Sequence, residues 1–177
     1  MTEEFNEMDM ERSQALNVEI KEEPKKFLTF LSDGLTFAID ATNVGEIITN
    51  YSITIVPNVP SFIKGIINLR GNIIPVLSLR NRFGLPEVPD TDRTEFLITK
   101  VDETLLALKV DEVDSIYDLE TAQIFETPAI VRTPETAYMD QVILLEDKRL
   151  TIELNTNELL SKQEKEAVQK MLEEQKK

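Results

Sequence analysis

The sequence has no cysteine and no histidine among its 177 residues. Without cysteine it can form no disulfide, no thiolate metal site and no cysteine nucleophile. Without histidine it lacks the usual general base near neutral pH and the commonest protein ligand for metals. These absences exclude most familiar catalytic centres and leave only carboxylate or Ser/Lys chemistry. We therefore expect a protein with no catalytic site, no metal and no cofactor.

Positive charge and long hydrophobic runs are also scarce. The chain has 19 Lys and Arg against 33 Asp and Glu, a formal net charge of −14, and no basic cluster outside its ends. Nucleic-acid backbones are bound by clustered Lys and Arg. No apolar stretch approaches the roughly 18 residues that span a bilayer, and the acidic N-terminus does not resemble a signal peptide. The composition predicts a cytoplasmic protein that binds neither nucleic acid nor membrane directly.

Between residues 27 and 160 the pattern is one of short β-strands separated by turns. Two β-hairpins are predicted around Asp33-Gly34 and Arg70-Gly71, because glycine tolerates the positive φ of tight turns. Residues 84–93 contain a glycine, two prolines and three acidic residues. We interpret them as a connector between two halves of the chain.

The second half repeats the first. A shift of 69 positions places Phe27 on Phe96 and Asp33 on Asp102 without a gap. A shift of 77 positions aligns the second hairpin of the first half with residues 142–154. This later match is looser; it sets Ile66 against Ile143 and Ile73 against Leu150.

Each half has about five predicted strands, and so small a sheet exposes its edges unless it curls into a barrel. Packing two small barrels together also enlarges a core that would be thin in either alone. The sequence therefore predicts an all-β fold of two packed five-stranded SH3-like barrels. The expected subdomains are about 27–85 and 94–160, and a ten-stranded sandwich is the structural alternative.

The two ends of the chain differ. Residues 1–26 hold eight acidic and four basic residues with dispersed apolar ones, which is typical of a disordered or weakly helical tail. At the other end, Ser161 and Glu164 fit a capping box. The apolar residues that follow recur at helical spacing, at Ala167, Val168, Met171 and Leu172. We predict a short amphipathic helix over 161–177, docked on the body or, less favoured, offered to a partner.

Several motifs stand in a characteristic order along residues 27–160. They are Phe37-Ala-Ile-Asp40, Val44-Gly-Glu-Ile-Ile48, Phe62-Ile-Lys-Gly-Ile-Ile-Asn-Leu-Arg-Gly71, Ile74-Pro-Val-Leu-Ser-Leu-Arg80 and Val110-Asp-Glu-Val113. As a set, they resemble the CheW family of chemotaxis coupling proteins. Two departures fall in the second half: no glycine stands near Tyr138-Met-Asp-Gln141, and Ala107 replaces a frequent glycine.

The resemblance implies a non-catalytic adaptor. Members of the family bind the regulatory domain of the histidine kinase CheA and the cytoplasmic tip of chemoreceptors, so that receptor state controls kinase activity. It also implies a protein that is monomeric when free and a partner-binding set in the first half, namely Val44, Glu46, Ile47, Asn68, Leu69, Arg70 and Gly71. The alternative within the family is a competitor or ring-filling component of the signalling array. From another class, a carboxylate-only hydrolase or sugar-binding barrel would need two facing carboxylates in a concave apolar site.

Each candidate site residue also has a purely structural interpretation. Arg70 is either a solvated turn arginine or a guanidinium fork offered to a partner. We expect Glu46 in a helical turn after the second strand, where it either faces a partner or pairs with Arg70. Asn68 can pin the hairpin turn, and the aliphatic members are either core or an exposed apolar patch. The acidic group Asp111, Glu112 and Asp114 is read as a solvated turn, since it lacks the spacing and loop glycine of a calcium site.

Overall fold

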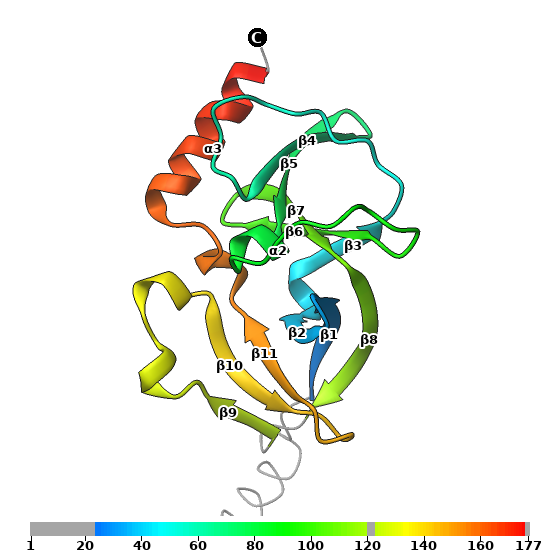
Figure 1. Cartoon of the computed structure of the whole chain (residues 1–177), viewed down its shortest axis with the longest axis vertical. Helices are drawn as coiled ribbons and strands as arrows, with labels where there is room; N and C mark the ends of the chain where they lie inside the picture. Colours follow the sequence, from blue (N-terminus) through cyan, green and yellow to red (C-terminus); the bar gives the residue numbers. More distant parts are fainter. Residues whose placement is uncertain (1–23, 120–122, 176–177) are drawn as a thin grey trace, which may run out of the picture.

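The computed structural model describes residues 24–119 and 123–175 and consists of two β-sheets with few helices (Figure 1). The six-stranded sheet, here barrel A, has the order β8-β1-β2-β11-β10-β9. The five-stranded sheet, barrel B, has the order β3-β6-β7-β5-β4. The predicted all-β, two-barrel fold is confirmed, with six strands in one barrel where five were expected.

The strands are short throughout. Those of barrel A are β1 (Lys25–Ser32), β2 (Leu35–Asp40), β8 (Glu112–Leu119), β9 (Ile124–Glu126), β10 (Met139–Leu144) and β11 (Leu150–Leu154). Those of barrel B are β3 (Val44–Ile48), β4 (Ile63–Leu69), β5 (Asn72–Ser78), β6 (Glu95–Val101) and β7 (Thr104–Val110). Helix α2 (Leu79–Arg82) follows β5, and helix α3 (Lys162–Gln175) ends the described chain.

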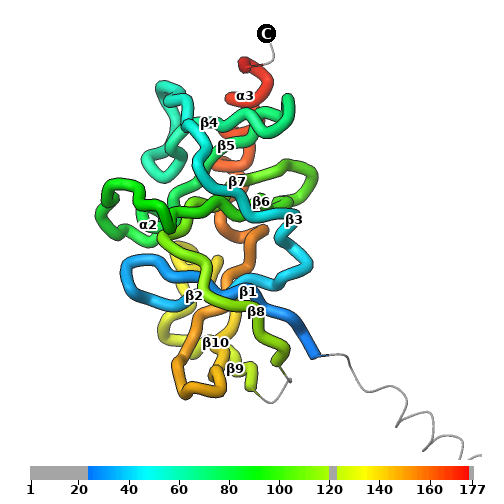
Figure 2. The backbone as a smooth tube through the Cα atoms, turned by 90° about the vertical axis from the view of Figure 1, so that its right-hand side faces the viewer, coloured from blue at the N-terminus to red at the C-terminus, as the bar shows by residue number. Residues whose placement is uncertain are grey.

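Each barrel takes strands from both halves of the chain. The β1–β2 hairpin lies between β8 and β11, and the β6–β7 hairpin lies between β3 and β5. Figure 2 shows β3 to β7 in the upper part of the molecule and the other strands below. The predicted subdomains of about 27–85 and 94–160 therefore do not coincide with the two barrels. Each half of the chain gives its first hairpin to the barrel that is built mainly by the other half.

This exchange has a packing reason. The outward faces of the two exchanged hairpins are apolar and meet in the largest core cluster, which contains Phe30 and Phe37 from one hairpin and Leu97 and Leu108 from the other. Two smaller clusters fill the barrel interiors. Burying both hairpins between the barrels joins the two into one structure, because removing either barrel would expose the apolar face that the other contributes to the shared cluster.

The strand registers confirm the internal repeat. In barrel A, Phe27 pairs with Asp40, and in barrel B the residues 69 positions later, Phe96 and Lys109, form the same pair. The later hairpin needs a correction. Its partners show that Ile66 corresponds to Val142, and not to Ile143 as expected, because the loop between β10 and β11 is one residue longer.

The sixth strand of barrel A has a smaller counterpart in barrel B. Strand β9 pairs with β10 over three residues, whereas in barrel B only Thr54 forms a bridge, to Ile66 of β4. Both backbone hydrogen bonds of that bridge are made, at 2.8 and 2.9 Å. The difference between five and six strands thus reflects the length of one closing segment, and the two barrels share one topology.

Helix α3 begins with the predicted capping box. The Glu164 N–H donates to the Ser161 hydroxyl at 3.2 Å, and the Ser161 N–H donates to the Glu164 carboxylate at 2.8 Å. The helix docks on the body and buries Val168 and Met171. Strand β1 begins at Lys25, so the last two residues of the predicted tail belong to barrel A; residues 1–23 lie outside the described residues.

Candidate functional site

The tip of the β4–β5 hairpin presents Arg70 and Gly71 at the surface. Both have positive φ, 53° and 89°, which defines a tight two-residue turn of the kind that matches the twist of a hairpin. The Gly71 N–H donates to the Asn68 side-chain oxygen at 2.8 Å. The amide of Asn68 therefore pins the turn, and the turn holds the guanidinium of Arg70 away from the core.

Arg70 forms a bidentate ion pair with Glu46. Its two terminal nitrogens donate to the two carboxylate oxygens at 2.8 and 3.1 Å, and these hydrogen bonds raise the pKa of the Arg70 guanidinium. The side chains are 71% and 34% exposed. Since β3 and β4 are the two edge strands of barrel B, the pair joins its edges at the surface.

The expected position of Glu46 is wrong. A 3₁₀ turn is present, but it covers Ala41–Asn43, and Glu46 lies on strand β3. The Asp40 side chain caps that turn by accepting the Thr42 N–H, and the chain is extended again from Val44. Pairing of β3 with β6 then sets the direction of the Glu46 side chain.

The aliphatic candidates divide into exposed and buried residues. Ile47 is 40% exposed, while Leu69 is 4% exposed and belongs to the interior of barrel B. Val44 is partly buried and packs against the core between the barrels. The surface part of the predicted set is therefore Glu46, Ile47, Asn68, Arg70 and Gly71, which we call the Glu46–Arg70 patch.

Sequence reasoning missed a further exposed aliphatic residue of barrel B. Ile55 is 82% exposed and directly follows Thr54, which bridges to Ile66 on the same strand as Asn68. The only sequence signal is its place in the β-branched run Thr54-Ile-Val56. Alternation in a strand predicts one outward side chain there but does not say which.

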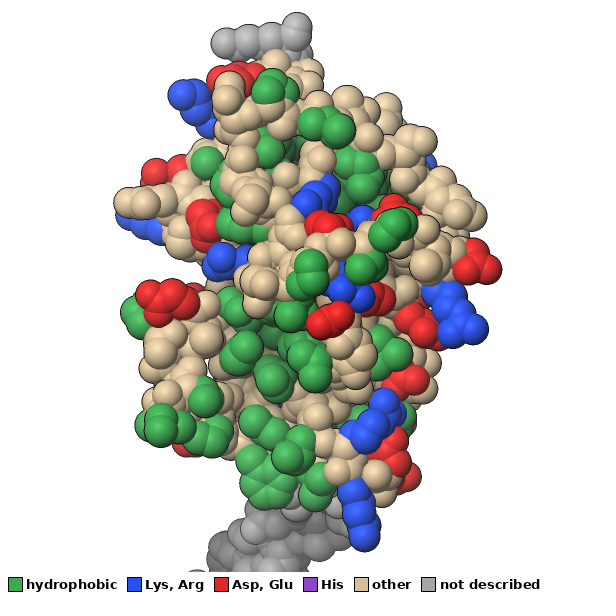
Figure 3. Space-filling view, viewed as in Figure 1, with side chains coloured by type: hydrophobic (Ala, Val, Ile, Leu, Met, Phe, Trp, Pro, Cys, Tyr) green, Lys and Arg blue, Asp and Glu red, His purple; other side chains and the backbone are tan. Residues whose placement is uncertain are grey.

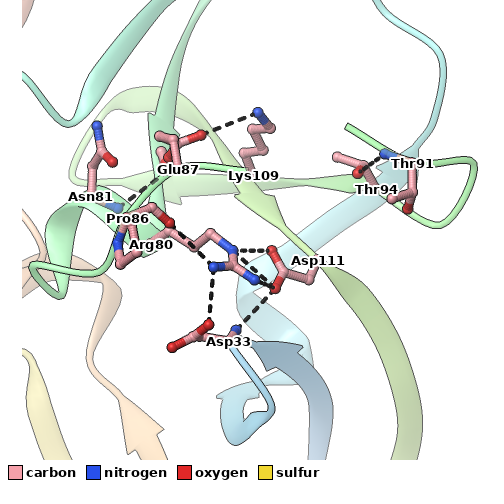
Figure 4. A network of polar contacts seen from close by, with 10 residues as sticks. Asp33, Arg80, Asn81, Pro86, Glu87, Thr91, Thr94, Lys109 and Asp111 are labelled. Carbon is pink, nitrogen blue, oxygen red and sulfur yellow. Dashed lines mark hydrogen bonds and ion pairs between the residues drawn. The ribbon is translucent and has the colours of Figure 1, made fainter. Parts of the chain in front are cut away.

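The acidic group after β7 does not gather around one point. Asp111 accepts hydrogen bonds from Arg80 at 2.8 and 3.0 Å (Figure 4). Glu112 pairs with Arg93 at 3.5 Å and Asp114 with Arg149 at 3.2 Å. Each carboxylate thus has its own cation, and the described residues contain no group of three acidic, histidine or cysteine side chains that could hold a metal ion.

A cleft of about 190 Å³ between α3 and the β6–β7 hairpin is the best candidate for an apolar ligand site. Its two carboxylates belong to Asp102 and Glu103, whose side chains are 62% and 94% exposed and pair with Lys165 and Lys100. Glycosidase-type chemistry needs two carboxyl groups that flank the substrate in a concave site. In this cleft both carboxylates are exposed and paired with lysines.

Within the described ranges, none of the helices has both the length and the apolar character required to cross a membrane.

Comparisons with known proteins agree with the motifs. The CheW-like domain model matches residues 26–164. The chemotaxis protein CheW of Bacillus subtilis is 32% identical over 78% of this chain and 88% of its own length. The chemotaxis protein CheW of Klebsiella aerogenes is 31% identical over 79% and 84%.

A solved structure shares the fold. The scaffolding protein TtCheW of Thermoanaerobacter tengcongensis superposes with a TM-score of 0.73 and 31% sequence identity, over 80% of this chain and 95% of that one. The match of fold, of motif order and of nearly the whole β region leads to one conclusion. The chain belongs to the CheW-like domain family, whose members named here are chemotaxis and scaffolding proteins.

Proposed function

We propose that this protein is a non-catalytic scaffold of chemotaxis signalling that couples chemoreceptors to a CheA-type histidine kinase. The observation that carries the proposal is the family match over residues 26–164. A scaffold acts through surfaces, and it controls a kinase when the assembled receptor shifts the equilibrium between kinase states. It needs no reactive side chain, which suits a chain without histidine or cysteine.

We place the partner contact at the Glu46–Arg70 patch. An exposed guanidinium fork can donate to a carboxylate or a backbone carbonyl. Ile47, the neighbour of Glu46 on β3, adds an exposed apolar side chain on the other face of that strand. Leu69 and Val44 support the patch from beneath, since both pack inward. In the free protein, which we expect to be monomeric, Arg70 and Glu46 satisfy each other and a partner competes for them.

Reconstitution of kinase, receptor cytoplasmic fragment and this protein tests the proposal. If the protein couples the two, adding it raises the receptor-dependent autophosphorylation rate of the kinase. A competitor or ring-filling component would lower that rate in a mixture that already contains a coupler. If the protein co-sediments with neither partner at tens of micromolar, the scaffold proposal is wrong.

Arg70→Ala tests the placement of the contact. The turn is held by Asn68 and Gly71, so the variant should keep the wild-type unfolding midpoint while binding weakens at least fivefold. Arg93→Ala is the matched control, because Arg93 is 72% exposed and is also paired with a glutamate; it should bind normally. The exchange Glu46→Arg with Arg70→Glu separates the two roles of the pair. Restored binding would mean that the pair acts only within this chain, and it would contradict a partner contact at Arg70.

A further inference from the structure

Three neighbouring strands of barrel B bring two lysines and a serine together. Lys64 lies on β4, Ser78 ends β5 and Lys109 lies on β7. The parallel register of β5 with β7 sets Ser78 directly beside Lys109, and β4 pairs with β5 on the other side. We call these three residues the lysine site. Because all of them stand on paired strands, the sheet fixes their positions.

The connector of residues 84–93 occupies the lysine site with its own acidic side chains. The Ser78 hydroxyl donates to the Glu87 carboxylate, which also pairs with Lys109 at 3.6 Å and with Lys64 at 3.9 Å. In Figure 4 the Glu87 side chain points toward Lys109. Asp90, three residues later, pairs with Lys109 at 2.5 Å. One hydroxyl and two ammonium groups thus hold a single carboxylate, as they would hold that of a ligand.

The lysine site is better shielded from water than the acids that it holds. The side chain of Lys109 is 15% exposed, whereas that of Asp90 is 51% exposed, and Ser78 is buried. A shielded ammonium group is unfavourable without an anion beside it. The site therefore favours a bound carboxylate, whether the connector or another segment supplies it.

The connector itself is attached by polar contacts and by little else. Residues 85–91 form neither helix nor strand, and within the described chain none of the three core clusters includes a member of 84–93. The Pro86 carbonyl accepts a hydrogen bond from Arg80 at 3.2 Å, while Val88 is 44% exposed. Segments with few buried apolar contacts open at a low cost in free energy. A competing carboxylate can therefore displace the connector without disturbing the core.

The surrounding surface carries charges of both signs. Figure 3 shows Asp and Glu side chains beside Lys and Arg side chains in the middle of the view, where Figure 1 places α2. The chain as a whole has a net charge of −14, so most of its surface repels an acidic partner. Two lysines that already hold carboxylates mark a place where such a partner can bind.

We propose that the lysine site binds an acidic segment of a partner protein, and that the connector occupies the site in the free protein as a replaceable internal ligand. The partner segment carries two carboxylates three residues apart, the spacing of Glu87 and Asp90. Two residues at this spacing share one side of a helix, so a helical segment can present both carboxylates to the site.

The lysine site is separate from the Glu46–Arg70 patch. Lys64 stands near the start of β4, and Arg70 follows its end. A partner can therefore engage the two surfaces independently. The connector is tethered at both ends, which keeps its carboxylates at an effective concentration in the millimolar range beside the site. An isolated acidic peptide should bind the wild-type protein weakly for this reason.

The absence of cysteine allows a single nitroxide to be placed on the connector of the full chain, at Val88→Cys. The probe is a peptide with the connector sequence 84–93 and blocked ends, added at low ionic strength. We expect the peptide at millimolar concentration to raise the mobile fraction of the nitroxide at least twofold. The same peptide with Glu87→Gln and Asp90→Asn is the matched control and should leave the spectrum unchanged.

Binding of the same peptide, carrying a fluorescent label, tests the lysine site directly. In the full-length protein with Glu87→Gln and Asp90→Asn the connector no longer competes, so the affinity for the peptide should rise at least tenfold over wild type. Adding Lys64→Gln and Lys109→Gln should abolish that gain. The matched control is Asp92→Asn with Asp118→Asn, which changes the net charge equally at two exposed residues and should bind as wild type does.

Three outcomes would overturn the proposal. No release of the nitroxide and no gain in affinity would mean that the connector is a permanent part of the fold. Release by the control peptide would mean that the site does not recognise carboxylates. Equal release by inorganic phosphate at the same ionic strength would assign the site to small anions and not to a protein segment. These assays contain neither kinase nor receptor, so their failure leaves the scaffold proposal standing.

Discussion

Glu153 of β11 is a carboxyl group where the other barrel has an aliphatic side chain. Register matches it with Val76 of β5, and it is 9% exposed, with one carboxylate oxygen lacking a hydrogen-bond partner. Burial, with smaller effects from the charges of Asp140 and Asp40, raises the pKa of Glu153 to about 7, and Lys25 opposes this rise. An ionised Glu153 is therefore unfavourable in the folded state.

Stability should fall as pH rises through the neutral range because of this group. The folded pKa of about 7 lies above the ordinary glutamate value of 4.5, so the stability that this group contributes is fully present below pH 4.5 and is lost as pH rises through 7. The loss is on the order of 3 kcal/mol. Glu153→Gln should remove this slope and raise the urea midpoint at pH 8, with little change at pH 5.

Glu126→Gln is the matched control for this titration, since Glu126 lies exposed on β9 of the same barrel. It should change the urea midpoint at pH 8 less than Glu153→Gln does, because the Glu126 side chain is already exposed to solvent. A wild-type slope equal to that of Glu153→Gln between pH 5 and 8 would contradict the burial argument. Asp140 and Asp40, the two acidic neighbours of Glu153, would then have moved toward solvent.

At the scale of elements, closure of barrel B depends on one glycine. Gly65 of β4 has a φ of 144°, and a Cβ there would lie 2.1 Å from the backbone oxygen of Thr54. The bridge between Thr54 and Ile66 brings the closing segment this near. In barrel A the corresponding residue is Gln141, which pairs with Glu126 in a regular ladder, so the glycine expected near Gln141 is not needed.

Gly65→Ala should therefore destabilise the protein by about 3 kcal/mol or more. The added Cβ would clash with the backbone of Thr54, and a backbone atom cannot move aside as the end of a flexible side chain can. Gly45→Ala is the control, since its Cβ would have no contact nearer than 3.6 Å and should change stability by less than about 1 kcal/mol. Chemical denaturation of both variants measures the difference. Similar denaturation midpoints for the two variants would show that the backbone at Thr54 can shift to accommodate the added methyl group and that the closing segment is not rigidly packed.

The elements also mark what the sequence can predict. Hairpins at Asp33-Gly34 and Arg70-Gly71, the capping box at Ser161 and the repeat itself were predictable, because each depends on neighbouring residues. The exchange of hairpins between barrels was not, since both arrangements bury the same apolar side chains and only tertiary pairing distinguishes them.

The candidate site was predicted in part for a similar reason. The family motifs indicated Arg70 and Glu46. Of the two alternatives for Glu46, contact with a partner or pairing with Arg70, the structure shows the pairing. Burial separated Leu69 from Ile47, although both are aliphatic residues within the same motifs. The exposed leucines of barrel A, Leu35 and Leu150, match no motif, because the sequence alone does not distinguish them from ordinary strand residues.

At the scale of the whole molecule, the two junctions between the barrels are unequal. On one side Arg80 of α2 donates to Asp111, to Asp33 in the β1–β2 turn at 3.1 Å, and to the Pro86 carbonyl at 3.2 Å (Figure 4). On the other side the equivalent residue is Asn157, whose side-chain oxygen accepts one N–H, from Asp102, at 3.3 Å.

The Arg80 side chain is only 12% exposed, so its ion pairs are partly shielded from water and should matter more than surface pairs. Arg80→Ala should lower the unfolding free energy by about 2 kcal/mol, because it leaves Asp111 without its partner. Asn157→Ala, the change at the equivalent position, should lower it by less than about 1 kcal/mol. Urea denaturation at pH 7 compares the two variants under the same conditions.

The pH dependence of that loss identifies its cause. Burial raises the pKa of Asp111, but hydrogen bonds from Arg80 and from the Asp33 N–H outweigh it, so the net shift is downward from 3.8. The Arg80 contribution is therefore present above pH 3.8 and is lost as pH falls through the lower folded pKa. The difference in unfolding free energy between wild type and Arg80→Ala should become smaller below pH 4. The difference between wild type and Asn157→Ala should not change with pH. Equal losses of unfolding free energy for both variants at pH 7 would mean that the apolar core alone holds the barrels together and that the ion pairs of Arg80 add nothing to it.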